Sequence, residues 1–128
     1  MNDVEILRLL RVHFDGLFPK ACSCGRRFAT LREYILGTEL IRGTISYDAA
    51  SGAWEPTQLL GMLALSNCAC GSTLALSTEG LPLATRHLLL AWVRAETERR
   101  GVSSEEVVGT LRDEIRTRVL TDPVQLPP

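Results

Sequence analysis

The chain has 128 residues, the length of one domain, and its 45% apolar and 23% charged content excludes a chain that is disordered throughout. A net charge of −1 excludes a strong bulk attraction to nucleic acid or to an anionic membrane. No apolar run reaches the ~18 residues of a membrane span, and the N-terminus lacks the basic start of a signal peptide, so a cytoplasmic location is expected. Of the 14 basic residues only Lys20 is a lysine, an arginine bias associated with bacterial genomes rich in GC.

The first predicted element is an amphipathic helix over residues 3–14. Its apolar positions recur at steps of three and four residues, at Val4, Leu7, Leu10 and Phe14. A polar residue at position 2 or 3 is the expected cap, and Gly16 is the expected end.

A second, shorter helix is predicted after the segment ACSCGRRF (21–28). Thr30 followed three residues later by Glu33 is a capping-box pattern, and Gly37 is a plausible end. The sequence therefore predicts a helix of about two turns directly behind the first pair of cysteines.

The middle of the chain has the composition of strands. LIRGTISY (40–47) is rich in β-branched residues, and DAASGAW (48–54) is expected to connect a hairpin. LLGMLALS (59–66) then leads into NCACGSTL (67–74), and STLALST (72–78) leads out of it. The simplest interpretation of residues 59–78 is strand, knuckle, strand.

Two helices are predicted at the C-terminal end. Pro82 stands where the first begins, and two arginines followed by Gly101 suit its end. Ser103 and Glu106 form a capping box for the second, whose apolar face comprises Val108, Leu111, Ile115 and Val119. The turn between them is very short, which predicts an antiparallel helical hairpin.

All four cysteines fall in two Cys-x-Cys-Gly units, Cys22-x-Cys24-Gly and Cys68-x-Cys70-Gly. In the reducing cytoplasm such pairs favour metal ligation over disulfides. Structural Zn²⁺ takes four tetrahedral ligands, and thiolates are its commonest donors. One residue between two ligands makes a tighter bite than the usual two, and four thiolates also suit iron–sulfur centres. Thiol redox chemistry and four merely buried cysteines are the alternatives.

The segments ACSCGRRF and NCACGSTL, each flanked by apolar residues, look like the knuckles of zinc-ribbon-type domains. NCACGSTL is similar to small bacterial proteins built on paired Cys-x-Cys-Gly units. The resemblance covers about residues 20–78 and implies a small sheet stabilised by zinc, with no secure activity.

Other residues offer less. His13 and His87 have no nearby partner in a ligand-like spacing, and no nucleophile elbow or phosphate loop is present, so no enzyme is predicted. The apolar helix segment 88–93 must be covered on several sides, either by packing against the N-terminal and C-terminal helices or by a dimer or partner interface. Trp54, near the hairpin, is either a lid on the core or an exposed anchor. The candidate partner-binding residues are Leu89 and Trp92 in that helix, Trp54, and Arg26 and Arg27 beside the first knuckle.

These observations predict an α+β fold in which a four-cysteine zinc site organises a small antiparallel β element, flanked by helices and closed by a C-terminal helical hairpin. One domain is expected over residues 1–120, with the ribbon-like part at 20–78, the hairpin at 81–120 and a flexible tail at 121–128. The expected function is a non-enzymatic zinc-binding adaptor or regulatory protein acting through a protein partner or self-association. The alternatives are a nucleic-acid-binding regulator, with Arg32 joining Arg26 and Arg27 in a basic patch, and a thiol redox sensor.

Overall fold

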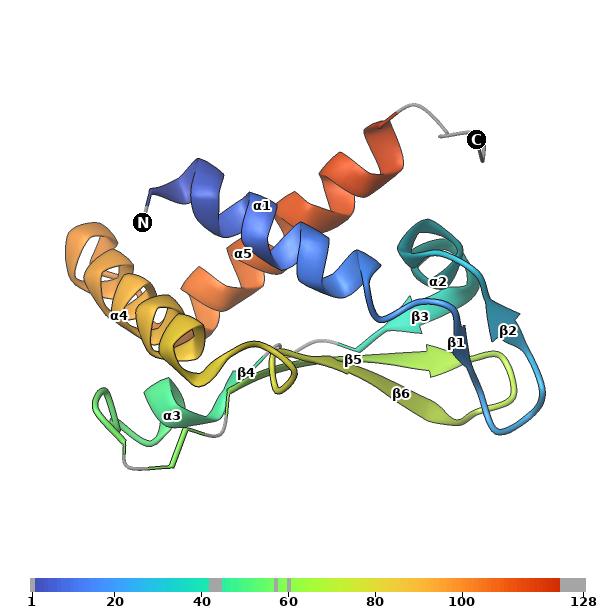
Figure 1. The fold of residues 1–128 in the computed structure, drawn as a ribbon, viewed down its shortest axis with the longest axis horizontal. Coiled ribbons are helices and arrows are strands. Elements are labelled where there is room, and N and C mark those ends of the chain that lie inside the picture. The colour runs from blue at the N-terminus through green and yellow to red at the C-terminus, as the bar shows by residue number, and fades with distance from the viewer. Residues whose placement is uncertain (1, 42–44, 57, 60, 123–128) are drawn as a thin grey trace.

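The computed structural model describes residues 2–41, 45–56, 58–59 and 61–122 and has the mixed α+β architecture that the sequence predicts (Figure 1). In chain order its elements are α1 (Asp3–Asp15), β1 (Lys20–Ala21), β2 (Arg27–Phe28), α2 (Leu31–Gly37), β3 (Thr38–Leu40), β4 (Ile45–Ser46), α3 (Tyr47–Ala50), β5 (Met62–Cys68), β6 (Thr73–Ser77), α4 (Leu83–Arg100) and α5 (Ser104–Thr121).

The main sheet is built around β5. Strand β6 pairs antiparallel with one edge of β5, and the short strands β3 and β4 pair antiparallel with two ends of the other edge. The register sets Thr38 opposite Cys68, and Asn67 opposite Thr73 across the turn. A separate hairpin of β1 and β2 lies beside the β5–β6 turn (Figure 1).

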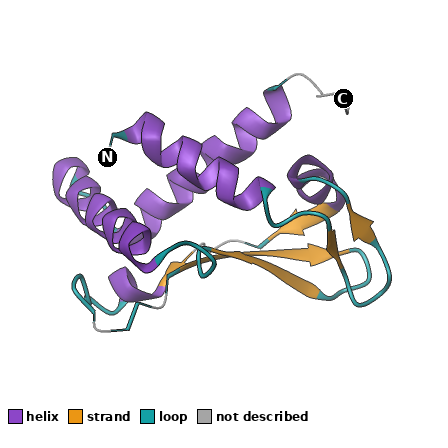
Figure 2. Ribbon diagram, in the orientation of Figure 1, coloured by secondary structure: helices purple, strands orange, loops and turns teal. Residues whose placement is uncertain are grey.

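The helices α1, α2 and α5 gather over one face of the sheet (Figure 2). The largest fully buried apolar side chains belong to α1, β2, α4 and α5. They are Ile6, Leu10, Phe28, Val93 and Val107. None of the helices in the described part of the chain combines the length and hydropathy that a membrane span needs.

The helix termini follow the predicted capping chemistry. The Asn2 side chain and Glu5 form a reciprocal capping box on α1, Thr30 accepts a hydrogen bond from the Glu33 N–H, and Ser103 does the same for α5. At the end of α4, Gly101 takes φ +66°, the left-handed conformation that glycine adopts without strain. The tight turn 101–103 returns the chain into α5 and closes the helical hairpin.

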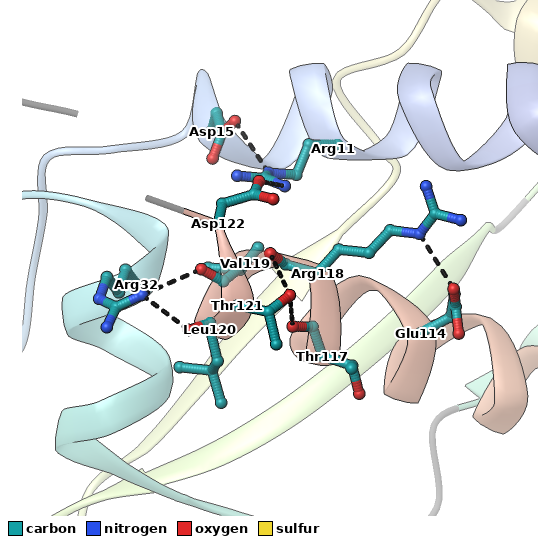
Figure 3. A network of polar contacts seen from close by, with 10 residues as sticks. All are labelled: Arg11, Asp15, Arg32, Glu114, Thr117, Arg118, Val119, Leu120, Thr121 and Asp122. Atoms are coloured by element: carbon teal, nitrogen blue, oxygen red, sulfur yellow. Dashed lines mark hydrogen bonds and ion pairs between the residues drawn. The ribbon is translucent and has the colours of Figure 1, made fainter. Parts of the chain in front are cut away.

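The C-terminal end of α5 is held by side chains from both N-terminal helices (Figure 3). The Arg32 guanidinium donates to the carbonyl oxygens of Val119 and Leu120, at 3.2 and 3.0 Å. Arg11 forms an ion pair of 2.6 Å with Asp122. A cation at a helix C-terminus interacts favourably with unpaired carbonyl groups, so Arg32 both caps α5 and fixes α2 against it.

Three details differ from the sequence-based expectations. The segment after β4 connects the antiparallel strands β4 and β5, as predicted, but its first residues, 47–50, form the short helix α3, with the Ala53 N–H donating to the Asp48 carbonyl behind it. Val4 is 58% exposed, because Ile6 and Leu10 provide the buried face of α1. Of the expected tail, Thr121 belongs to α5 and Asp122 caps it, while residues 123–128 lie outside the described part, as do 42–44 of the expected strand.

Candidate metal centre

The first knuckle is a tight turn between β1 and β2. The Cys22 N–H donates to the Arg26 carbonyl at 2.8 Å, and the Gly25 N–H donates back to the Cys22 carbonyl at 3.0 Å. Gly25 has φ +93°, a conformation that residues with a Cβ avoid. The glycine is therefore required to bring both thiols of the unit to the same side of the turn.

The second knuckle, between β5 and β6, repeats this geometry. The Cys68 N–H donates to the Ser72 carbonyl at 2.9 Å, the Gly71 N–H donates to the Cys68 carbonyl at 2.9 Å, and Gly71 has φ +94°. Two segments with unrelated flanks thus adopt one backbone conformation, because both carry Cys-x-Cys-Gly.

The fold brings the four cysteines of these knuckles together. The sulfur atoms of Cys22 and Cys70 are 3.5 Å apart and those of Cys24 and Cys68 are 3.8 Å apart, and all four lie within 4.8 Å of one another. Four sulfurs at the usual Zn–S length of ~2.3 Å from one tetrahedral ion would be about 3.8 Å apart. The cluster is positioned to bind a metal ion and is compatible with a zinc-ribbon-like site.

The four thiols differ in exposure. In each unit the first cysteine is buried and the second is exposed: Cys22 and Cys68 have 4% and 3% exposed surface, whereas Cys24 and Cys70 face solvent. A bound ion would therefore be covered by protein on one side only.

Hydrogen bonds already favour thiolate in part of the cluster. The Ser72 side chain and backbone N–H, the latter 3.4 Å from the Cys70 sulfur, lower the pKa of Cys70 to about 6. A backbone hydrogen bond from Cys24 lowers the pKa of Cys22. For Cys24, the backbone N–H of Arg26 lowers the pKa. The neighbouring Cys22 sulfur, burial and the other two sulfurs outweigh that hydrogen bond and raise the pKa of Cys24 to about 11. Four thiolates this close repel one another, and a divalent cation relieves that repulsion.

Ser72 is the site residue that the sequence interpretation missed. It supplies the N–H beside Cys70, and its hydroxyl lies 3.4 Å from that of Ser23 in the opposite knuckle. The signal was its position directly behind the glycine, where the turn aims the next backbone N–H at the second sulfur.

The predicted partner residues of α4 are part of the core. Leu89 is 2% exposed and Trp92 is 8% exposed, which agrees with the alternative of packing between elements, whereas Leu88 of the same segment is 55% exposed. Leu89 and Trp92 are therefore not available as partner-binding residues in this fold. Helix α4, which carries them, packs against α5 and α3. Trp54 is half-buried and packs against the core, and the Arg94 guanidinium lies 5.7 Å from the centre of its ring. It is a lid on the core and not an exposed anchor.

The three arginines of the predicted basic patch have different surroundings. The Arg26 guanidinium lies over the Phe28 ring at 5.0 Å and donates to the Gly37 carbonyl at 3.2 Å, and Arg32 caps α5. Arg26 and Arg27 are both exposed, whereas Arg32 is half-buried. A basic surface formed by Arg26 and Arg27 beside the first knuckle therefore stays a prediction, and Arg32 is engaged with α5.

The histidines lie away from the cysteines. His13 is hydrogen-bonded through Nε2 to the Ser77 carbonyl at 2.9 Å, which ties α1 to β6, and His87 is half-buried on α4. Neither belongs to the metal-ligating cluster found among the described residues.

Comparison with known proteins gives this chain no relative. No protein-family model matches it, no curated protein matches it, and no solved structure matches it. The cysteine cluster is therefore the feature of this chain that indicates a function.

Proposed function

We propose that the chain is a structural zinc protein of the cytoplasm, in which one Zn²⁺ bound by Cys22, Cys24, Cys68 and Cys70 joins the β1–β2 hairpin to the β5–β6 hairpin. The observation that carries the proposal is the sulfur spacing of 3.5 and 3.8 Å, which suits a single tetrahedral ion. A multi-iron cluster places several iron and sulfide atoms between its cysteines and needs more widely spaced sulfurs than this.

The protein is proposed to act by contact with another protein and not as an enzyme. Four thiolates fill the tetrahedral positions of zinc and leave none open for a substrate or an activated water, as a catalytic zinc requires. The described helices carry large apolar side chains that are more than half exposed, including Val12, Leu36 and Leu88, and these are candidate anchors for such contacts.

The test is native mass spectrometry of protein purified without a metal-affinity tag, followed by thermal melting with and without a chelator. We expect one zinc per chain and a large drop in melting temperature on chelation. Metal-free protein whose melting curve does not respond to zinc or chelator would overturn the proposal.

Two further measurements separate the adaptor from its alternatives. Binding to mixed-sequence DNA or RNA that weakens steeply with salt, and further with Arg27→Ala, would favour a nucleic-acid-binding regulator. Rapid loss of zinc on treatment with hydrogen peroxide would favour a redox sensor. In that reaction two thiolates and two protons reduce one peroxide to two waters and leave one disulfide.

A further inference from the structure

A hollow between the helices and the sheet offers a second site with no cysteine among its walls. Its apolar walls come from α1, α2, α5 and β6 and include Leu10, Leu31, Ile35, Leu76, Leu111 and Ile115. The hollow has a cavity volume of about 70 Å³. The whole space free of protein atoms, including the part open to solvent, is about 660 Å³. The hollow has room for several waters or for one slender hydrocarbon chain.

The hydroxyl of Tyr34 is an unpartnered polar group at this hollow. The residue is 2% exposed, and its ring is held edge-on by Phe18 and Phe28, each with a centroid distance of 5.5 Å. Burial raises the pKa of Tyr34, an effect that Ser66 and the charge of Arg116 oppose, yet no hydrogen bond of acceptable geometry joins the hydroxyl to any described residue. A buried hydroxyl without a partner is costly and calls for an explanation.

Arg116 brings a positive charge to the same hollow. It lies one turn beyond Arg112 on α5, and both side chains line the space. Arg112 is paired with Asp113 at 2.9 Å, whereas Arg116 has no ion pair or hydrogen bond in the described part of the chain. Burial, and then the charge of Arg112, lower the pKa of Arg116, while the charge of Asp113 opposes them. Asp113 is itself paired with Arg112, so the partly buried Arg116 guanidinium has no contact ion pair of its own in the described part of the chain and can accept an anion.

We propose that this hollow binds an amphipathic organic carboxylate of the fatty-acid class, with its hydrocarbon chain along the apolar walls and its carboxylate on Arg116 and the Tyr34 hydroxyl. Both polar groups donate hydrogen bonds, which selects an acceptor, and one free guanidinium matches one negative charge. The site shares no residue with the cysteine cluster, so it goes beyond the metal-binding function and does not depend on it.

The test is isothermal titration of the full zinc-loaded chain with decanoate, below its micellar concentration, and with decanol as the uncharged match. We expect one decanoate per chain, bound at least tenfold more tightly than decanol, with methyl NMR shifts centred on Leu31, Leu76 and Leu111. Equal affinity for the two compounds, or shifts centred elsewhere, would overturn the proposal.

Three variants locate the carboxylate. Arg116→Met keeps the apolar stem and should weaken decanoate at least tenfold while decanol binds as before. Arg118→Met is the matched control, because Arg118 is exposed on the same helix and paired with Glu114 at 2.9 Å; it should change neither affinity. Tyr34→Phe should weaken decanoate several-fold without lowering the melting temperature of the free protein, since it deletes only an unpaired hydroxyl. Unchanged decanoate affinity in Arg116→Met, or equal losses in Arg116→Met and Arg118→Met, would refute the assignment.

Discussion

The cysteine end of the molecule, which comprises the β1–β2 hairpin and the β5–β6 turn, differs from the helical end formed by α1, α4 and α5. At the cysteine end, the strands β1 and β2 have only two residues each. Their hairpin faces the β5–β6 turn through the cluster of four thiols. At the helical end, Ile6, Val93 and Val107 are buried to 1% exposure or less, and helices of 13 and 18 residues carry them.

This difference teaches where the stability of each end originates. A two-residue strand pair has too few hydrogen bonds and too little buried apolar area to persist alone. A structural zinc site contributes on the order of 10–16 kcal/mol of apparent binding free energy. The helical end instead depends on apolar burial, at roughly 25 cal/mol per Å². Chelation should therefore affect the two ends unequally.

The largest effect is expected from removing one ligand of the cysteine end. Cys68→Ala should abolish stoichiometric zinc binding and lower the free energy of unfolding by several kcal/mol, because the other thiolates lose their shared ion. Denaturant melts with metal analysis check this. Ser23→Ala, between two ligands, is the control and should keep one zinc. A Cys68→Ala protein that melts like the zinc-loaded parent would contradict the assignment of the cysteine end's stability to the metal.

At the helical end, Ile6→Ala should cost about 2–5 kcal/mol, because it leaves a cavity at a side chain with 0% exposure. The cost should be similar with zinc bound and after chelation. Val4→Ala, on the same helix but 58% exposed, should change stability by about 0.5 kcal/mol or less. An Ile6→Ala cost that disappears on chelation would show that the helical end also requires the metal.

A pair of glycine variants sharpens the comparison at smaller cost. Gly71 has φ +94° and open space where a Cβ would lie, so Gly71→Ala should cost about 1–2 kcal/mol through backbone strain alone and weaken zinc binding. Gly109 lies in α5 with equally open space, and Gly109→Ala should stabilise the helical end by about 0.5–1 kcal/mol. Denaturant melts of both variants check this, and changes of the same sign would contradict the assignment.

The smallest effect concerns acid stability at the helical end. The buried Glu96 carboxylate accepts hydrogen bonds from Arg99 at 2.6 Å and Arg100 at 2.7 Å, and these arginines lower the pKa of Glu96. Its contribution to stability is thus present above the unfolded pKa of 4.5 and is lost as the pH falls through the lower folded value.

Melting temperatures between pH 6 and pH 2.5 test this contribution. Glu96→Gln should remove part of the loss below pH 4.5. Glu98→Gln is the control, since the Glu98 side chain is 71% exposed and its contact with Arg94 is 3.5 Å. Equal acid profiles for the two variants would show that the buried carboxylate adds nothing.

The sequence by itself determined the features that depend on local chemistry. The capping residues Thr30 and Ser103, the glycine at 101 and the strand–knuckle–strand segment at 59–78 were all predictable, because each rests on neighbours a few residues away. The convergence of four cysteines was also predictable in kind, since short Cys-x-Cys-Gly units are typical of one shared ion.

Only the tertiary structure decided which side chains are covered and which polar groups find partners. Arg32 caps α5 through the carbonyl oxygen of Leu120, 88 residues away. Helices α3 and α5 pack against α4, whose apolar residues exceed what one buried face needs. The unpartnered Tyr34 hydroxyl beside Arg116 likewise depends on α2 meeting α5. Burial and long-range hydrogen bonds join residues distant in sequence, and no local pattern encodes the atoms that will face one another.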